Sequence, residues 1–347
     1  MAETKDDDRW SNSGRILKAS LVVAAVAILL LVLWTLSNVL LLVFASILVA
    51  ILLSSIADPI QRLTPFPRAA ALAVSVGLVA IFIAGFLTLL GAEISSEIQG
   101  LFSELPALLK SLGDQLGVEN LTQMVTDRLE GFLSRGDTML NFAGLTFTIF
   151  DMVLSFALVI VAGIYFAANP DTYRNGFLSL FPDSPRDNVG RTLDLSGKAL
   201  RYWLIGQLVA MTIIGFLSWL GLTLLGVPSA LALGFIAGVT DFVPVIGPIF
   251  GAIPAVLIAF SVSPTTALWV IGLYVLLQQI EGNIVQPLIQ KKAVNLPPAL
   301  TLFSLIGFGA LLGPMGILLA TPLAVVAIVA TKQLYVRKIS ASSDPET

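Results

Sequence analysis

Residues 227–261 have the sequence VPSALALGFIAGVTDFVPVIGPIFGAIPAVLIAFS, an apolar stretch interrupted by a single acid, Asp241, and by several prolines and glycines. Proline removes a backbone donor and glycine permits a chain reversal. We therefore expect a helix, a break shaped by Pro244, Gly247 and Pro248, and a second helix. The stretch is too long for one membrane-spanning helix, so it predicts a helical hairpin within a bilayer.

The same pattern recurs near the end of the chain, in residues 296–331. LPPALTL at 296–302 matches VPSALAL at 227–233, and an apolar arm, a break at Gly313-Pro314 and another apolar arm follow. Because a single apolar run, 265–285, separates the two copies, they should enter the membrane from opposite faces. Opposed broken-helix repeats are typical of secondary transporters.

The sequence is compatible with more than one depth of the hairpins in the membrane. Arms of about 15 residues would extend about 22 Å, short of the roughly 30 Å of hydrocarbon in a bilayer. This length favours re-entrant hairpins whose tips approach each other near the middle of the membrane. Tilted arms that cross completely, or ordinary helices merely kinked by glycine and proline, would give the same parity of crossings.

The composition places the chain in a membrane and excludes several kinds of chemistry. Of 347 residues, 56% are hydrophobic and 12% are charged, against about 25% charged in soluble domains. The sequence has neither Cys nor His and no phosphate-binding G-x-x-x-x-G-K-[ST] loop. We expect no enzyme activity, no metal site, no cofactor and no nucleic-acid partner; the partners should be the lipid bilayer and a transported species.

Basic residues predict the orientation. Sixteen of the 19 Lys and Arg residues lie in the two tails or in connections on one side of the expected spans. The other three, Lys110, Arg128 and Arg135, share 92–148 with eight acids. The positive-inside rule therefore places both termini in the cytoplasm and 92–148 outside.

The fold class is an all-α, polytopic transmembrane bundle. Its expected parts are a cytoplasmic tail (1–17), three transmembrane helices (18–91), extracytoplasmic amphipathic helices (92–148), a transmembrane helix (149–168), a cytoplasmic charged helical segment (169–202), a transport core (203–331) with hairpins 227–261 and 296–331, and a cytoplasmic tail (332–347).

The extracytoplasmic insert has apolar residues at three- or four-residue steps, from Ile94 through Leu116 and again from Leu121 to Leu133. This spacing predicts two amphipathic helices. They could pack on each other or lie in the membrane interface. They could instead form a contact between subunits or a lid over the outer mouth.

Two acids are the main candidate site residues. Between Arg201 and Lys291 the chain has no basic residue, and its only acids are Asp241 and Glu281. An ionised carboxylate at the bilayer centre costs roughly 2.5–3.5 kcal/mol on insertion scales. Asp241 could carry a proton or cation, or accept a hydrogen bond from a solute. It could also be a turn residue that faces cytoplasmic water.

Glu281 belongs to a polar cluster at the end of run 265–285. On a regular helix Gln278 and Glu281 would share one face, and Asn283 and Gln286 would lie on a neighbouring face. We expect these side chains to line the transport pathway, although they could simply extend into the membrane interface. Uncharged amides are unusual where Lys or Arg would anchor the helix better.

Three motifs carry a family resemblance: DFVPVIGP at 241–248, EGNIVQP at 281–287, and LLGPMG at 311–316 with Thr321-Pro322 after it. Together they resemble the autoinducer-2 exporter family of bacterial permeases, over almost the whole chain. The resemblance implies a multi-pass protein of the bacterial inner membrane that forms a homo-oligomer. It also implies export of autoinducer-2 or, as in other family members, sodium/proton exchange.

The function expected from the sequence is secondary transport by alternating access. The chain would export a small polar solute similar to autoinducer-2, or exchange monovalent cations for protons. A passive channel and a non-transporting membrane scaffold are the alternatives. An intramembrane aspartyl protease needs two carboxylates that share a proton, but no Gly-x-Gly-Asp motif surrounds Asp241.

The expected orientation can be tested with single cysteines, because the native chain has none. Ser103→Cys should react with a membrane-impermeant thiol reagent only from outside, and Ser179→Cys only from the cytoplasmic side. Reaction of the cysteine at 103 from the cytoplasmic side alone would contradict the whole topology.

Overall fold

The computed structural model describes residues 20–85 (apart from 25, 29 and 30), 88, 142–287 and 297–336. These residues form helices and turns, with no strand among them. The fold is therefore an all-α helical bundle, as the sequence predicted. The amphipathic helices expected from Ile94 to Leu133 lie outside the described residues. The helix expected at 149–168 begins earlier, at Phe142.

The N-terminal part of the bundle is built around α2 (Ser37–Leu63) and α5 (Phe142–Ala168). A further helix, Arg68–Gly85, lies between them in the chain. The Arg68 guanidinium donates to the carbonyl of Ala167 at 2.9 Å and so binds one of the carbonyls left free at the end of α5.

A sharp bend follows α5. Helix α6 (Pro170–Leu178) turns by 90° from it, and α7 (Asp183–Leu224) then runs for 42 residues. Arg174 of α6 forms a two-bond ion pair with Asp194 of α7, with both contacts at 2.8 Å. The hydrogen bond from Arg174 lowers the pKa of the Asp194 carboxyl below its ordinary value. The charged segment expected at 169–202 is therefore not separate from the next apolar run, because α7 continues through both.

The first hairpin consists of two short helices, α8 (Ala230–Thr240) and α9 (Ile246–Val262). Helix α10 (Pro264–Ile280) returns beside α9 and ends in a π-helical turn, η2 (Glu281–Val285). With 11 residues, α8 extends only about 16 Å. This length is about half of the hydrocarbon thickness of a bilayer.

The second hairpin consists of α12 (Pro298–Leu318) and α13 (Ala320–Thr331), followed by a π-helical turn, η3 (Lys332–Val336). Helix α12 is broken at Gly313, whose φ of 67° and ψ of −153° lie in a region that is essentially restricted to glycine. A second break follows at Leu319. The turn of this hairpin is therefore a short helical segment between two breaks.

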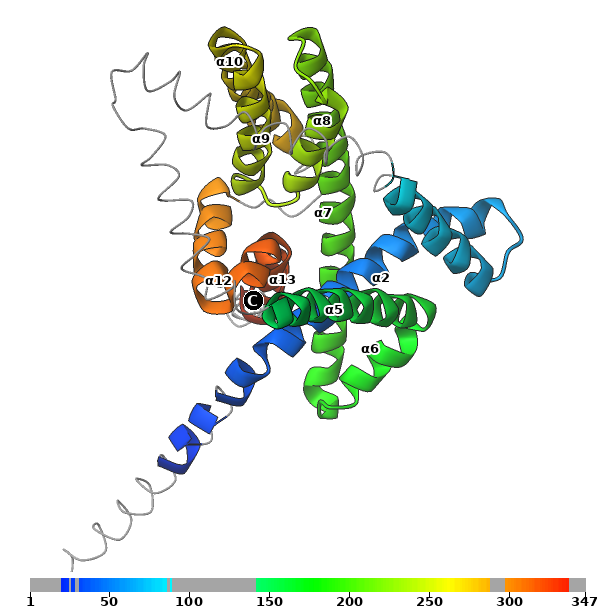
Figure 1. The fold of residues 1–347 in the computed structure, drawn as a ribbon. Helices are drawn as coiled ribbons and strands as arrows, with labels where there is room; N and C mark the ends of the chain where they lie inside the picture. Colours follow the sequence, from blue (N-terminus) through cyan, green and yellow to red (C-terminus); the bar gives the residue numbers. More distant parts are fainter. Residues whose placement is uncertain are drawn as a thin grey trace, which may run out of the picture.

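The long helix α7 joins two groups of helices (Figure 1). Its second half packs with α8, and α9 and α10 complete this upper group around a core that includes Leu222 and Leu233. Its first half packs with α2 and α13 around a core that includes Leu204 and Val325. Arg201 of α7 contacts Asp58 of α2 at 2.6 Å in this lower group.

Glycines allow α7 and α8 to pack closely. Gly234 and Gly238 of α8 form a G-x-x-x-G pair against Gly215 of α7, the pattern that lets membrane helices approach each other. A Cβ at position 238 would lie 2.7 Å from the backbone oxygen of Met211. The first hairpin is thereby fixed against the second half of α7.

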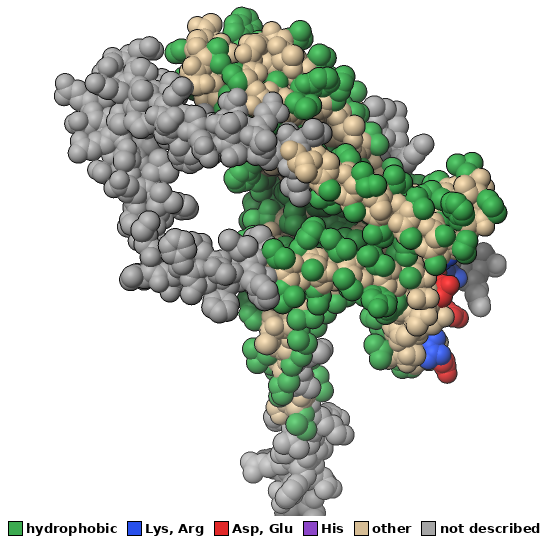
Figure 2. Space-filling view, turned by 45° about the vertical axis from the view of Figure 1, so that its right-hand side comes forward, with side chains coloured by type: hydrophobic (Ala, Val, Ile, Leu, Met, Phe, Trp, Pro, Cys, Tyr) green, Lys and Arg blue, Asp and Glu red, His purple; other side chains and the backbone are tan. Residues whose placement is uncertain are grey.

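Within the described part of the chain, five helices are long and apolar enough to cross a membrane, or six if the bent pair around Asn169 counts as one span. The face shown in Figure 2 is mostly hydrophobic, and the charged side chains visible on it gather at one end. This distribution suits contact with lipid tails. The chain is a multi-pass membrane protein.

The packing of α7 on α8 predicts that Gly238→Ala destabilises the protein, by roughly 1–3 kcal/mol as for other overpacked sites. Gly272→Ala on α10 is the matched control, because a Cβ there has no neighbour within 4 Å. Thermal unfolding in detergent measures both variants. Equal unfolding temperatures for the two would show that α7 and α8 do not pack as described.

Candidate transport site

Asp241 lies at the end of α8, in the turn that leads to α9. Its side chain is fully buried, and neither carboxylate oxygen has a hydrogen-bond partner among the described residues. An unpartnered buried carboxylate is costly and in native proteins requires an explanation. A bound cation, a proton or a donor group of a solute would supply the missing partner.

Glu281 faces Asp241 from the first residue of η2 and is 3% exposed. The two carboxyl groups lie close enough for their charges to interact, although no hydrogen bond joins them. Gln286 donates through Nε2 to Oε1 of Glu281 at 3.3 Å. This contact spans five residues and depends on the wider π-helical turn, a feature often found at functional sites.

Among the residues that the structure describes, few charged side chains belong to the helices around this acid pair. Helices α8, α9, α12 and α13 contain no charged residue, and Tyr274 is the only ionisable group of α10. On α7 the nearest charged residue is Arg201, which already contacts Asp58. Two carboxylates that face each other without a cation disfavour double ionisation. The pair is therefore suited to take up a proton or another positively charged group.

Gln207 of α7 also belongs to the site, although the sequence analysis did not select it. It is 2% exposed, and its Nε2 donates to the backbone carbonyl of Asp241 at 2.7 Å. One signal could have identified it, because Gln207 is the only amide side chain in the apolar run 203–225. Its proximity to Asp241, 34 residues away, depends on the tertiary fold.

Two of the expected pathway residues lie apart from the acid pair. Asn283 is exposed and donates to the backbone and side-chain oxygens of Gln279, at 2.9 and 3.0 Å. Gln278 is exposed and lines an open groove of about 490 Å³ between α9 and α10. The structure thus brings together Asp241, Glu281 and Gln286, and it places Asn283 and Gln278 on outer faces of α10 and η2.

The reversal of the first hairpin falls two residues before the expected Gly247-Pro248. Val245 has φ 73° and ψ −51°, and Ile246 N–H donates to the carbonyl of Pro244 at 2.9 Å. Gly247 and Pro248 already belong to the first turn of α9, where proline needs no backbone donor. Gly247 is needed for a different reason, since a Cβ there would overlap the backbone of Thr240.

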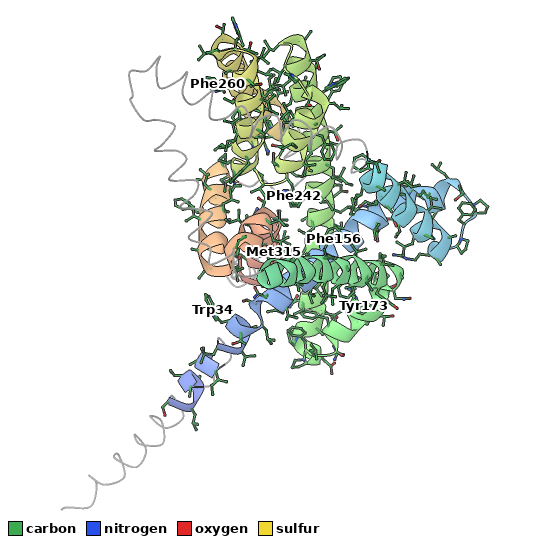
Figure 3. All side chains as sticks on the ribbon, in the orientation of Figure 1. Trp34, Phe156, Tyr173, Phe242, Phe260 and Met315 are labelled. Atoms are coloured by element: carbon green, nitrogen blue, oxygen red, sulfur yellow. The ribbon has the colours of Figure 1, made fainter. Side chains whose placement is uncertain are left out.

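The turns of the two hairpins pack against the same group of core residues. Phe242 of the first and Leu312 of the second pack against the same core cluster, which includes Leu319. The ring of Phe242 also stands edge-on to Trp203 of α7, with centroids 5.8 Å apart. Figure 3 labels Phe242 and Met315, in the turns that lie between the upper and lower groups of helices. Gly313 forms the second break as expected, and Pro314 follows it at the start of a new helical turn.

The described residues contain no group of three or more His, Cys, Asp or Glu side chains that could hold a metal ion. They do contain a second pair of buried polar atoms, the hydroxyls of Ser218 on α7 and Tyr274 on α10, neither with a hydrogen-bond partner. Tyr274 lies two helical turns before Glu281. Two buried polar groups therefore lie near α7 and α10, the pair of hydroxyls and the acid pair. Only the acid pair carries charge.

Comparison with known proteins identifies the kind of protein to which this site belongs. A family model described as "AI-2E family transporter" matches residues 23–336. The chain is 30% identical to the Bacillus subtilis protein named "Putative transport protein YueF" over 80% of each chain. It is also 26% identical to "AI-2 transport protein TqsA" of Escherichia coli, over 82% of this chain and 84% of that protein.

The unpartnered carboxylate predicts an unusual response to mutation. Asp241→Asn should leave the unfolding temperature unchanged or raise it, because it removes a buried charge that has no partner. Asp58→Asn is the matched control and should lower the unfolding temperature slightly, since it weakens the contact with Arg201. A large loss of stability in Asp241→Asn alone would mean that the carboxylate has a structural partner after all.

Proposed function

This chain belongs to the AI-2E transporter family, and we propose that it is a secondary transporter whose transported species binds between Asp241 and Glu281. The observation that carries the proposal is the buried carboxylate of Asp241, whose two oxygens have no hydrogen-bond partner in the described part of the chain while a second acid faces them. Such a pair can bind and release a positive or hydrogen-donating species, as a transport cycle requires.

The chemistry of the pair limits the transported species. A proton or a monovalent cation would offset the charge of the facing carboxylates, and exchange of one for the other would keep the site neutralised throughout the cycle. A small polar solute would instead donate hydroxyl groups to the oxygens of Asp241. The name of TqsA supports a solute similar to autoinducer-2, whereas the acid pair supports cation/proton exchange.

The position of the site supports alternating access. Gln207, which binds the turn at Asp241, lies six residues beyond Arg201, or about 9 Å along α7. The site would then lie nearer the charged, cytoplasmic end of α7 than the membrane centre that the sequence suggested. The described structure would then be the state in which the acid pair lies near the cytoplasmic side of the membrane. Movement of the hairpins would expose the acid pair to the opposite side.

The remaining features of the proposal follow from the family resemblance and from the basic residues. The protein would lie in the bacterial inner membrane as a homo-oligomer with both termini in the cytoplasm. The hairpins would be re-entrant, as the short α8 supports. A passive channel and a non-transporting scaffold are the rival functions, and transport assays separate them from a transporter.

Purified protein in liposomes tests the proposal. Asp241→Asn should lower flux at least about tenfold, since it removes a charged binding partner. Glu281→Gln should lower flux to a different extent, and both changes should flatten its pH dependence because the pair contains the only acids in the apolar half. Asp187→Asn, on the exposed first part of α7, is the control and should transport normally.

Counter-transport distinguishes a carrier from a channel. Unlabelled substrate inside the liposomes should accelerate uptake of labelled substrate, and uptake should saturate. Candidate substrates are autoinducer-2 and, separately, Na⁺ with a reporter of internal pH. Flux without saturation or counter-transport would favour the channel, and absence of any flux for both candidates would favour the scaffold.

A further inference from the structure

We propose that Gln207 is a positioning residue, which holds the turn of the first hairpin in a strained conformation and thereby keeps Asp241 turned toward Glu281. The proposal rests on the proposed function, because it concerns the geometry of the same acid pair. It assigns a role to a side chain that touches neither carboxylate but binds the backbone of one of the acids. We name the strained segment, residues 241–247, the tip.

The strain lies at Val245. A positive φ is an outlier for a β-branched residue, and the turn that it forms closes with a hydrogen bond over only three residues. Positive-φ conformations of non-glycine residues persist only when their surroundings hold them, and they gather at binding sites and switches. Val245 is 40% exposed, so neighbouring residues cover its side chain only in part.

Most bonds within the tip are local. Phe242, Val243 and Gly247 donate to carbonyls three or four residues earlier, at 2.8–3.2 Å. The bonds of Phe242 and Val243 join the tip to the end of α8, and the bond of Gly247 lies within the tip, so none of them joins the tip to α7 directly. Contacts from α7 itself are needed to orient the tip against that helix.

Helix α7 provides those contacts. The Gln207 amide donates to the Asp241 carbonyl at 2.7 Å, and one turn earlier the Trp203 ring stands edge-on to Phe242. The carbonyl of Asp241 lies at the end of α8, where backbone carbonyls lack helical partners. The bond from Gln207 is buried, so breaking it would leave this carbonyl unpaired in an apolar surrounding.

The hydrogen bond and the strain therefore oppose each other. Gln207 favours the described tip, whereas the backbone of Val245 favours an alternative one. If Gln207 releases the carbonyl, the tip can relax and Asp241, the residue that carries the carbonyl, changes its direction. Gln207→Leu should then populate the relaxed tip, and Val245→Gly should populate the described tip, because glycine adopts a positive φ without strain.

Modification of a single cysteine measures the state of the tip. Val243→Cys is introduced into the protein in liposomes, and its reaction rate with a small, water-soluble thiol reagent is recorded. Gln207→Leu should raise this rate about tenfold, the effect expected from loss of one buried hydrogen bond. Val245→Gly should lower the rate and, combined with Gln207→Leu, should bring it back toward the native value.

Ser229→Gly is the matched control. Ser229 is the other described non-glycine residue with a positive φ, 50°, and it precedes α8 at the end opposite Asp241. Its replacement relieves strain outside the tip and should leave the reaction rate of the cysteine at 243 unchanged. An equal effect of Ser229→Gly and Val245→Gly would overturn the proposal, because the hairpin would then respond to general stabilisation.

Transport kinetics test the link to Asp241. Gln207→Leu should raise KM, because fewer molecules hold a competent site, and this rise should be smaller than the rise in cysteine reaction rate as long as the described tip remains the major state. Adding Val245→Gly should lower KM again. If Gln207→Leu fails to fold, Gln207→Asn, which keeps the amide on a shorter side chain, replaces it. Unchanged reaction rate and KM in a folded Gln207 variant would overturn the proposal, whereas normal flux in Asp241→Asn would overturn the proposed function instead.

Discussion

The structure depends on the requirement that backbone polar groups in a bilayer find partners within the protein. A continuous helix meets this requirement alone, but a broken helix leaves free carbonyls and N–H groups at the break. Both hairpins of this chain contain such breaks, and Phe242 and Leu312, one from each turn, pack against the same core cluster. At the first break, the carbonyl of Asp241 receives its donor from Gln207 of α7. Helix α7 therefore supplies the hydrogen-bond donor that allows a broken helix to lie within the membrane.

Helix α7 also explains how a carboxylate without a partner can be retained. The glycine contacts between α7 and α8 bring the backbones close together, and the turn after α8 is then held beside Gln207 and Trp203. Asp241 is buried because this packing surrounds it, rather than because its own side chain is stabilised. The packing of the hairpin provides the free energy that offsets the unfavourable burial of the acid. A site of this kind combines a rigid support with a side chain that is ready to bind.

Local sequence patterns predicted the larger features of the fold but not the details of the site. The apolar runs and the paired Gly-Pro motifs identified an all-α membrane protein with two broken hairpins, and the two isolated acids identified the pair that the structure brings together. The reversal at Val245 could not be predicted, because no local preference places a β-branched residue at positive φ. The roles of Asn283 and Gln286 also depended on an unexpected π-helical turn, which changes the faces assigned by regular helical spacing. Gln207 was missed because its partner lies on another helix.

The π-helical turn at Glu281–Val285 has a consequence for how the chain can vary. A π-helical turn holds about one residue more than an α-helical turn. The residues after it are therefore rotated about the helix axis relative to the positions that a regular continuation of α10 would give them. Each residue of an α-helix advances by about 100°. Deletion of a single residue within 282–285 would therefore convert the turn into regular helix and place Gln286 four residues after Glu281, about 40° away around the helix axis, so the amide and the carboxylate would stay on one face. Sequence comparisons that permit a one-residue gap at this point would be more informative than those that forbid it.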